Sequence, residues 1–128
     1  PMRVLTVAAT FAIALANPEA SPAKLDGSTL LRSCTTAVAQ DGKANVQLSS
    51  DESFGFGLCL GLLRGIVEMS GAMNLVCTPD GFDYTQMARI VVKRLEDHPE
   101  TLHSSASALA YTAIQEAFPC GTKSKGAR

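Results

Sequence analysis

The chain has 128 residues, a formal net charge of −1, 46% hydrophobic residues and four cysteines. This length allows one domain that buries a real core. Because basic residues cluster only in the short tail 123–128, the chain lacks the concentrated basic face that a nucleic-acid-binding protein needs.

The first residues have the pattern of a secretory signal peptide. Arg3 precedes an uncharged apolar run that ends in small residues at Ala16, an order typical of exported precursors. A buried helix is the alternative, but the run has no polar face and is too short to span a bilayer comfortably. We therefore expect residues 1–16 to be a cleaved signal peptide, residues 17–24 to be a linker, and the mature protein to be periplasmic without membrane contact.

Two helices are predicted in the first half of the domain. Asp26 is placed to cap a helix that carries apolar residues at three- and four-residue intervals and fades near Gln40. Ser49 and Glu52 have the spacing of a capping box, and the helix that they open should run to about Ala72.

Two further helices are predicted after a turn-rich stretch. Asp83 and Gln86 repeat the capping spacing before a helix that His98 and Pro99 should end. Proline is also favoured in a first turn, so Pro99 can open a last helix that continues to residue 118.

No run of alternating apolar and polar residues is long enough to predict a strand. The predicted fold is therefore all-α, a compact domain of four to five helices over residues 25–120, followed by a disordered tail at residues 121–128.

The second helix contains a stripe of glycines four residues apart, Gly57, Gly61 and Gly65. A phosphate-binding loop would need a different glycine spacing after a strand, and Arg64 and Glu68 interrupt the apolar run before the length of a membrane helix is reached. Each glycine costs about 0.8–1 kcal/mol relative to alanine inside a helix. Close approach of another helix, from the same chain or from the second subunit of a homodimer, would offset that cost; the alternative is that the glycines simply face water.

The four cysteines permit three disulfide connectivities, and export would favour two bridges. Cys34 and Cys59 lie on the apolar faces of the first two helices. Cys77 precedes the third helix and Cys120 follows the fourth, so an antiparallel pair would bring them together. We predict Cys34–Cys59 and Cys77–Cys120, each stabilising by about 3–4 kcal/mol.

The sequence offers no convincing enzyme or metal site. His98 and His103 are the only histidines, and the cysteines lack the spacing of zinc ligands. Serines 104, 105 and 107 stand near the histidines, but serine beside histidine is common in the first turn of a helix. We therefore expect no catalytic residues, no metal and no cofactor.

Several motifs together resemble the Rap/Tai immunity-protein family. The resemblance covers about residues 30–120, and the matching positions are Cys59, Gly61, Gly65, Cys77, Pro79, Gln86, Val91, Pro99, Phe118, Pro119 and Cys120. Leu62 departs from the pattern, since the family often has an aromatic residue there. The resemblance implies a small exported helical protein that binds and inhibits a peptidoglycan amidase delivered by type VI secretion. A periplasmic structural or chaperone-like protein is the alternative, because fold does not dictate function.

An inhibitor of a cleft enzyme needs a rigid protrusion with a few anchors. Residues 74–84, stiffened by Cys77 and Pro79, are the better candidate, and the turn at residues 96–100 is the second. In segment 74–84 the predicted partner-binding residues are Leu75, Asp80, Phe82, Asp83 and Tyr84. Phe82 has a second interpretation, as a hydrophobic staple onto Met87 or its neighbours.

Overall fold

The computed structural model describes residues 24–121, so the predicted signal peptide and the tail after residue 121 lie outside it. Helices α1 (Gly27–Ala39), α2 (Ser50–Ala72), α3 (Tyr84–Asp97) and α4 (Ala106–Ala117) are joined by loops and one 3₁₀ turn, η1 (Pro99–Thr101). Over residues 24–121 there is no strand, only two isolated bridges. The predicted all-α class is confirmed.

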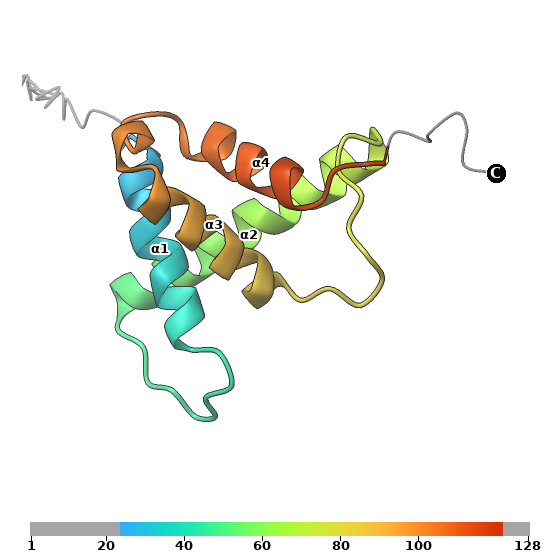
Figure 1. Ribbon diagram of the computed structural model, residues 1–128. Helices are drawn as coiled ribbons and strands as arrows, with labels where there is room; N and C mark the ends of the chain where they lie inside the picture. The colour runs from blue at the N-terminus through green and yellow to red at the C-terminus, as the bar shows by residue number, and fades with distance from the viewer. Residues whose placement is uncertain (1–23, 122–128) are drawn as a thin grey trace, which may run out of the picture.

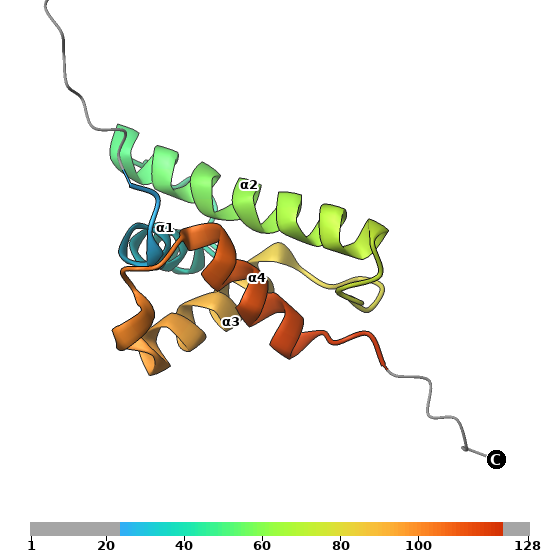
Figure 2. The same cartoon turned by 90° about the horizontal axis from the view of Figure 1, so that it is seen from above.

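The helices form a bundle in which α2 is the longest member. Figure 1 shows α4 across the top of the molecule, with α1 and α3 below it. Seen from above in Figure 2, α2 runs along one side and α3 along the other, with α1 viewed nearly end-on between them. One face of α2 therefore lies on the bundle, and the opposite face is turned away from it.

The predicted helix starts are confirmed at α1 and α2. The side chain of Asp26 accepts a hydrogen bond from the backbone N–H of Thr29 at 3.1 Å, which also lowers the pKa of this carboxyl group. At α2, Ser49 and Glu52 exchange both bonds of a capping box, at 2.9 and 3.2 Å. Each cap satisfies N–H groups that have no partner inside the helix.

The prediction that one helix runs on from Pro99 is wrong. Proline opens only the short η1 turn, and α4 starts at Ala106. The backbone between η1 and α4 instead accepts hydrogen bonds from the start of α1. The N–H of Gly27 donates to the Ser104 carbonyl at 3.0 Å, and the N–H of Ser28 donates to the Leu102 carbonyl at 3.3 Å. A Cβ at Gly27 would lie 2.8 Å from the Leu102 Cα, so only glycine fits this crossing.

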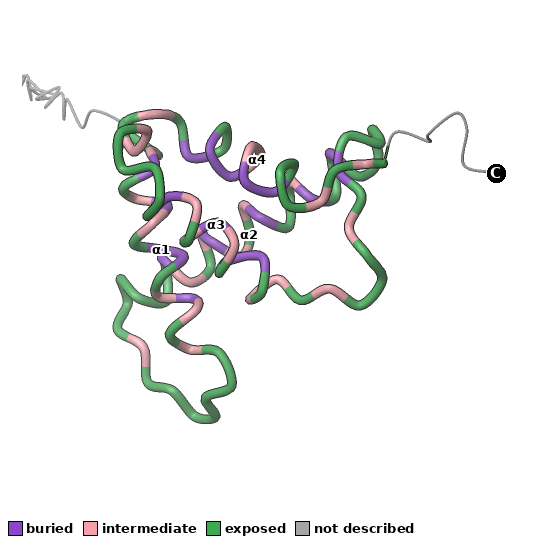
Figure 3. The backbone as a smooth tube through the Cα atoms, viewed as in Figure 1, coloured by how far each residue is buried: buried purple, intermediate pink, exposed green. Residues whose placement is uncertain are grey.

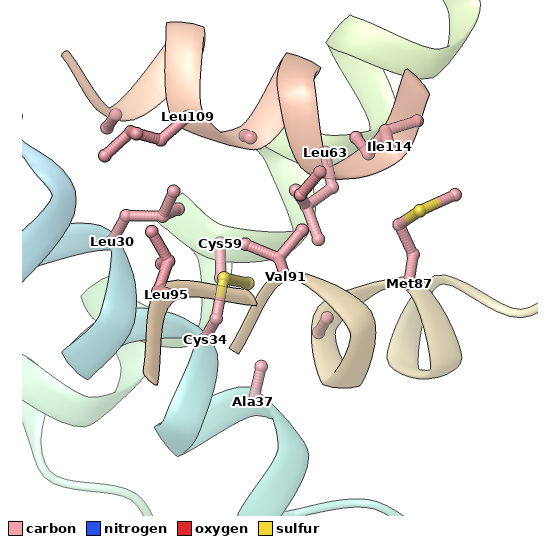
Figure 4. Packing of buried hydrophobic residues seen from close by; sticks show 14 of the residues in the cluster. Leu30, Cys34, Ala37, Cys59, Leu63, Met87, Val91, Leu95, Leu109 and Ile114 are labelled. Atoms are coloured by element: carbon pink, nitrogen blue, oxygen red, sulfur yellow. A yellow bond between two sulfur atoms is a disulfide. The ribbon is translucent and has the colours of Figure 1, made fainter. Parts of the chain in front are cut away.

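The core joins all four helices. Its largest fully buried side chains, all labelled in Figure 4, are Leu30, Leu63, Met87, Leu95, Ile114, Val91, Cys34 and Cys59. Burying a side chain such as leucine contributes about 1.5–3 kcal/mol. This shared interior is what fixes the helices relative to one another.

Both predicted disulfides are confirmed. Cys34–Cys59, the core disulfide, joins α1 to α2 with a Cα–Cα distance of 5.0 Å, and both residues are 0% exposed. Cys77–Cys120, the surface disulfide, has a Cα–Cα distance of 4.8 Å and links the chain before α3 to the chain after α4. One bridge therefore belongs to the core, and the other holds a loop.

Helix α2 has 23 residues and an 18-residue window of mean hydropathy 1.3. It is the one helix within residues 24–121 that is long and apolar enough to cross a membrane, so the objection from length was wrong for it. The side chains of Cys59, Leu63 and Val67 are instead buried in the bundle. Length and composition therefore give only weak evidence for a membrane helix.

Candidate functional site

Segment 74–84 leaves the bundle as an exposed loop. Figure 1 shows it swinging outward from the end of α2 before it returns to α3, and Figure 3 shows that most of it is exposed. It begins with a tight turn, in which Asn74 has φ 56° and the N–H of Leu75 donates to the Ser70 carbonyl at 2.9 Å. A second turn contains Gly81 at φ 76°, a backbone conformation that favours glycine.

Three interactions clamp this segment to the end of α4. The surface disulfide is reinforced by a hydrogen bond from the Cys77 N–H to the Phe118 carbonyl at 3.0 Å. The next residue pair, Val76 and Pro119, forms an isolated antiparallel bridge, and Val76 is buried. The segment is thus anchored near its start, at Val76 and Cys77, as well as at the helices that flank it.

The aromatic residues of the segment pack on one another. The Phe82 ring lies edge-on to Tyr84 with centroids 5.0 Å apart, and 6.4 Å from the ring of Phe118. Phe82 and Tyr84 are half-buried against the core. Phe82 therefore supports the segment from within while part of its surface stays accessible.

The two acidic residues of the segment have different roles. The Asp83 side chain caps α3 by accepting from the Thr85 N–H at 3.1 Å, while the predicted return bond from the Asp83 N–H to the Gln86 side chain is not seen. Asp80 lies exposed at the second turn, and Leu75 is 42% exposed. Leu75 and Asp80 are thus the members of the predicted set whose side chains are most available to a partner.

The glycine stripe lies on the outward face of α2. A Cβ added at Gly57, Gly61 or Gly65 would have no neighbouring atom within 4 Å, so no helix within residues 24–121 packs there. The glycine that does allow a close helix approach is Gly55, where an added Cβ would lie 3.5 Å from the Cα of Ser33 in α1. Of the two expected neighbours, a helix from the described part of the same chain is excluded.

A groove of about 400 Å³ follows this outward face, and we call it the α2 groove. It is lined by Gly61 and Gly65 together with apolar side chains that include Ile66, Met69 and, from α4, Tyr111. Met69 is 66% exposed. The methionine was not among the predicted site residues, although it continues the four-residue spacing of the glycines.

Over residues 26–120 the chain matches the family described as Rap1a immunity proteins. The chain belongs to this family. No curated protein and no solved structure matches it significantly. Membership makes the protein an immunity protein against a secreted effector, a class that is generally non-enzymatic and that works by binding.

The disulfides of this Rap1a-family chain are compatible with a location outside the cytoplasm, where such bonds persist. Among residues 24–121, no group of three or more His, Cys, Asp and Glu side chains is placed to hold a metal ion. His98 contacts Glu100 through Nδ1 at 3.1 Å, and the Ser105 and Ser107 hydroxyl groups lie 3.0 Å apart. None of these contacts joins a serine to a histidine base.

A second groove, of about 520 Å³, runs between α3 and α4 and carries mixed charge. Arg94 donates two hydrogen bonds to the Glu116 carboxylate, at 2.6 and 3.0 Å. This pairing lowers the pKa of Glu116 and raises that of Arg94. The pair joins residues 22 apart in sequence, which is why periodicity within one helix gave no sign of it.

Proposed function

We propose that the protein is a periplasmic immunity protein that binds and inhibits a peptidoglycan amidase delivered by type VI secretion. The family match over residues 26–120 carries the immunity class. The amidase and the secretion route rest on the family resemblance described above. Two disulfides in a chain with an apolar N-terminal run support the periplasmic location.

We further propose that segment 74–84 is the inhibitory surface. Its clamp through the surface disulfide lowers the conformational entropy lost on binding, and preorganisation of this kind raises affinity. Leu75 and Asp80 would provide exposed apolar and charged contacts. Phe82 and Tyr84 would present the accessible edges of a supported aromatic pair, and Asp83 would hold the start of α3 in place.

Inhibition in this proposal is steric. A segment fixed at both ends and tied near its start by the surface disulfide enters or covers the catalytic cleft of the amidase, and the immunity protein contributes no reacting group. The protein would act as a homodimer whose subunits each present one segment. A minority of contacts carries most of the energy of such an interface, so truncation of one or two exposed residues should be sufficient to weaken it.

The test is coexpression of the chain in the periplasm with a candidate amidase, encoded beside it in the same genome. Protection from lysis and the inhibition constant of the purified pair are both measured. The informative variant is Leu75→Ala with Asp80→Ala. Its matched control is Val46→Ala with Asp51→Ala, because Val46 is 39% exposed against 42% for Leu75 and Asp51 is also exposed, and both lie outside segment 74–84 and outside the turn at residues 96–100.

We expect the segment variant to lose inhibition by about tenfold or more, which corresponds to about 1.4 kcal/mol, while the control retains it. If the segment variant retained inhibition, the binding site would move away from segment 74–84, toward the turn at residues 96–100. Failure of the unaltered chain to protect against any candidate amidase would favour the structural or chaperone-like alternative.

A further inference from the structure

A pocket of about 410 Å³ lies between α1 and the first turns of α2, and we call it the α1–α2 pocket. Its lining includes Arg32, Ser33 and Thr36 from α1 and Asp51, Phe54 and Gly55 from α2. Figure 1 and Figure 2 both show the start of α2 beside α1, at the end of α2 that is away from segment 74–84. The volume is within the range of small-molecule sites, which is about 300–1,000 Å³.

The two walls of this pocket are held together by the core. Gly55 allows the helices to approach closely, since an added Cβ would lie 3.5 Å from the Cα of Ser33 and 3.6 Å from its Oγ. The core disulfide joins the two helices beside Ser33 and one turn beyond Gly55. The capping box of Ser49 and Glu52 fixes the start of α2. The pocket is therefore preformed, which lowers the ordering cost of binding a ligand.

Two opposite charges line the pocket without forming an ion pair. The other arginines within residues 24–121 each pair with a carboxylate, whereas Arg32 pairs with none in this range. On the α2 wall, Asp51 likewise takes part in no ion pair with the residues that the structure describes. A guanidinium group binds a carboxylate through charge-assisted hydrogen bonds, and a carboxylate binds an ammonium group in the same way. The pocket thus presents a binding group for each end of a ligand that carries both charges.

A buried hydroxyl group lies in the same pocket without a partner. Ser33 is 4% exposed. Its neighbours Thr35 and Thr36 donate to backbone carbonyl groups of α1 at 2.7 and 3.2 Å, but the Ser33 hydroxyl group makes no such bond within residues 24–121. Buried polar groups normally have a hydrogen-bond partner, and a polar ligand atom would supply one here. Phe54, which is 71% exposed, adds an aromatic face that can cover an apolar part of the ligand.

We propose that the α1–α2 pocket binds a short zwitterionic peptide, with one free ammonium group and one free carboxylate. The carboxylate binds Arg32, the ammonium group binds Asp51, and the Ser33 hydroxyl group bonds to a polar atom between them. A peptide separates its two charges, as a ligand that bridges two helices must. Helix α2 has 23 residues and is about 35 Å long, so this site is separate from segment 74–84 and does not depend on the identity of the effector.

The test is titration of the ¹⁵N-labelled protein with the dipeptide alanylalanine, followed by NMR. We expect saturable binding, with shifts of backbone amide signals concentrated at residues 29–36 and 51–55. N-acetylalanylalanine lacks the ammonium group and alanylalanine amide lacks the carboxylate. Each should bind more weakly by about tenfold or more. Free alanine, whose two charges lie on one carbon atom, should also bind more weakly than the dipeptide.

The variants Arg32→Gln and Asp51→Asn should each weaken dipeptide binding by about tenfold or more. Ser33→Ala should weaken it by a smaller factor, because a neutral hydrogen bond is weaker than a charge-assisted one. The matched control is Arg64→Gln, which changes an exposed arginine of α2 outside the pocket and should leave binding unaltered. Circular dichroism verifies the fold of each variant. Absence of saturable binding, shifts centred outside the pocket, undiminished binding of the blocked dipeptides or of alanine, or an equal loss from Arg64→Gln would each overturn the proposal.

Discussion

Removal of the surface disulfide should cost the protein a large part of its stability. The bridge joins residues 43 apart in the sequence, and the chain-entropy relation gives about 4 kcal/mol for closure of such a loop. In the variant Cys77→Ala with Cys120→Ala, the Val76–Pro119 bridge and the Cys77 backbone bond can still form. They would then form within a less constrained chain. Since small domains are stable by about 5–15 kcal/mol, the loss is easily measured.

The assay is urea unfolding at 25 °C, followed by circular dichroism, for the unaltered protein and the double alanine variant. The free energy of unfolding should fall by about 4 kcal/mol. A loss below about 1 kcal/mol would refute the entropic argument and show that the noncovalent contacts alone hold the two chain ends together. A change in the slope with urea would mean that the denatured state had also changed.

The same variant also tests the role assigned to segment 74–84. Under conditions in which the variant is folded, segment 74–84 has lost its disulfide link to the chain after α4. The segment must then be ordered when the amidase binds. Ordering costs about 1–2 kcal/mol per residue fixed, so inhibition should weaken by about tenfold or more. Unchanged inhibition by a folded variant would show that the tie does not preorganise the binding surface.

Three further predictions concern separate parts of the fold. A mild reductant should open the surface disulfide first, because Cys77 is exposed whereas the cysteines of the core disulfide are 0% exposed. The order is measured by alkylating the freed thiols and mapping them by mass spectrometry. Equal rates of opening for the two bridges would contradict the prediction. The ion pair with Arg94 lowers the pKa of Glu116, so it stabilises the fold above the ordinary glutamate value of about 4.3, and this contribution is lost as pH falls through the lower folded value. Glu116→Gln should therefore flatten the fall in unfolding free energy on the acid side of that ordinary value, and an unchanged fall would argue against the ion pair. Gly27→Ala should destabilise the subunit by about 1–3 kcal/mol, because its Cβ would clash with the Leu102 backbone. Gly61→Ala should raise subunit stability by up to about 1 kcal/mol, because its Cβ would meet open space. Equal effects on the unfolding free energy would contradict the assignment of Gly27 to a crowded site and Gly61 to an open one.

Most of the fold was predictable because its signals are local. The caps at Asp26 and Ser49 depend on residues within one turn, and both appear as expected. The end of α3 before Pro99 follows from the steric restriction that proline places on the residue before it. The disulfide pairing followed from helix order alone, since an antiparallel α3–α4 pair brings the two flanking cysteines together.

The start of α4 could not be predicted, because its cause lies elsewhere in the chain. Residues 102–105 continue a spacing of apolar residues that suits a helix. The carbonyl groups of Leu102 and Ser104 nevertheless accept hydrogen bonds from the first N–H groups of α1. Gly27 makes that contact possible, and nothing in its local sequence indicates a crossing with Leu102. Hydrophobic periodicity describes one helix at a time. It therefore gives no sign of backbone hydrogen bonds between the start of α1 and the residues that precede α4.

The candidate site was predictable in place and less so in detail. The exposed loop and its disulfide followed from turn residues and cysteine order. The division of roles within it did not: Asp83 is engaged as a helix cap and Phe82 rests on Phe118, 36 residues away in the sequence. Likewise, periodicity placed the glycine stripe on the outward face of α2, but only the structure could show that none of the other helices within residues 24–121 covers it.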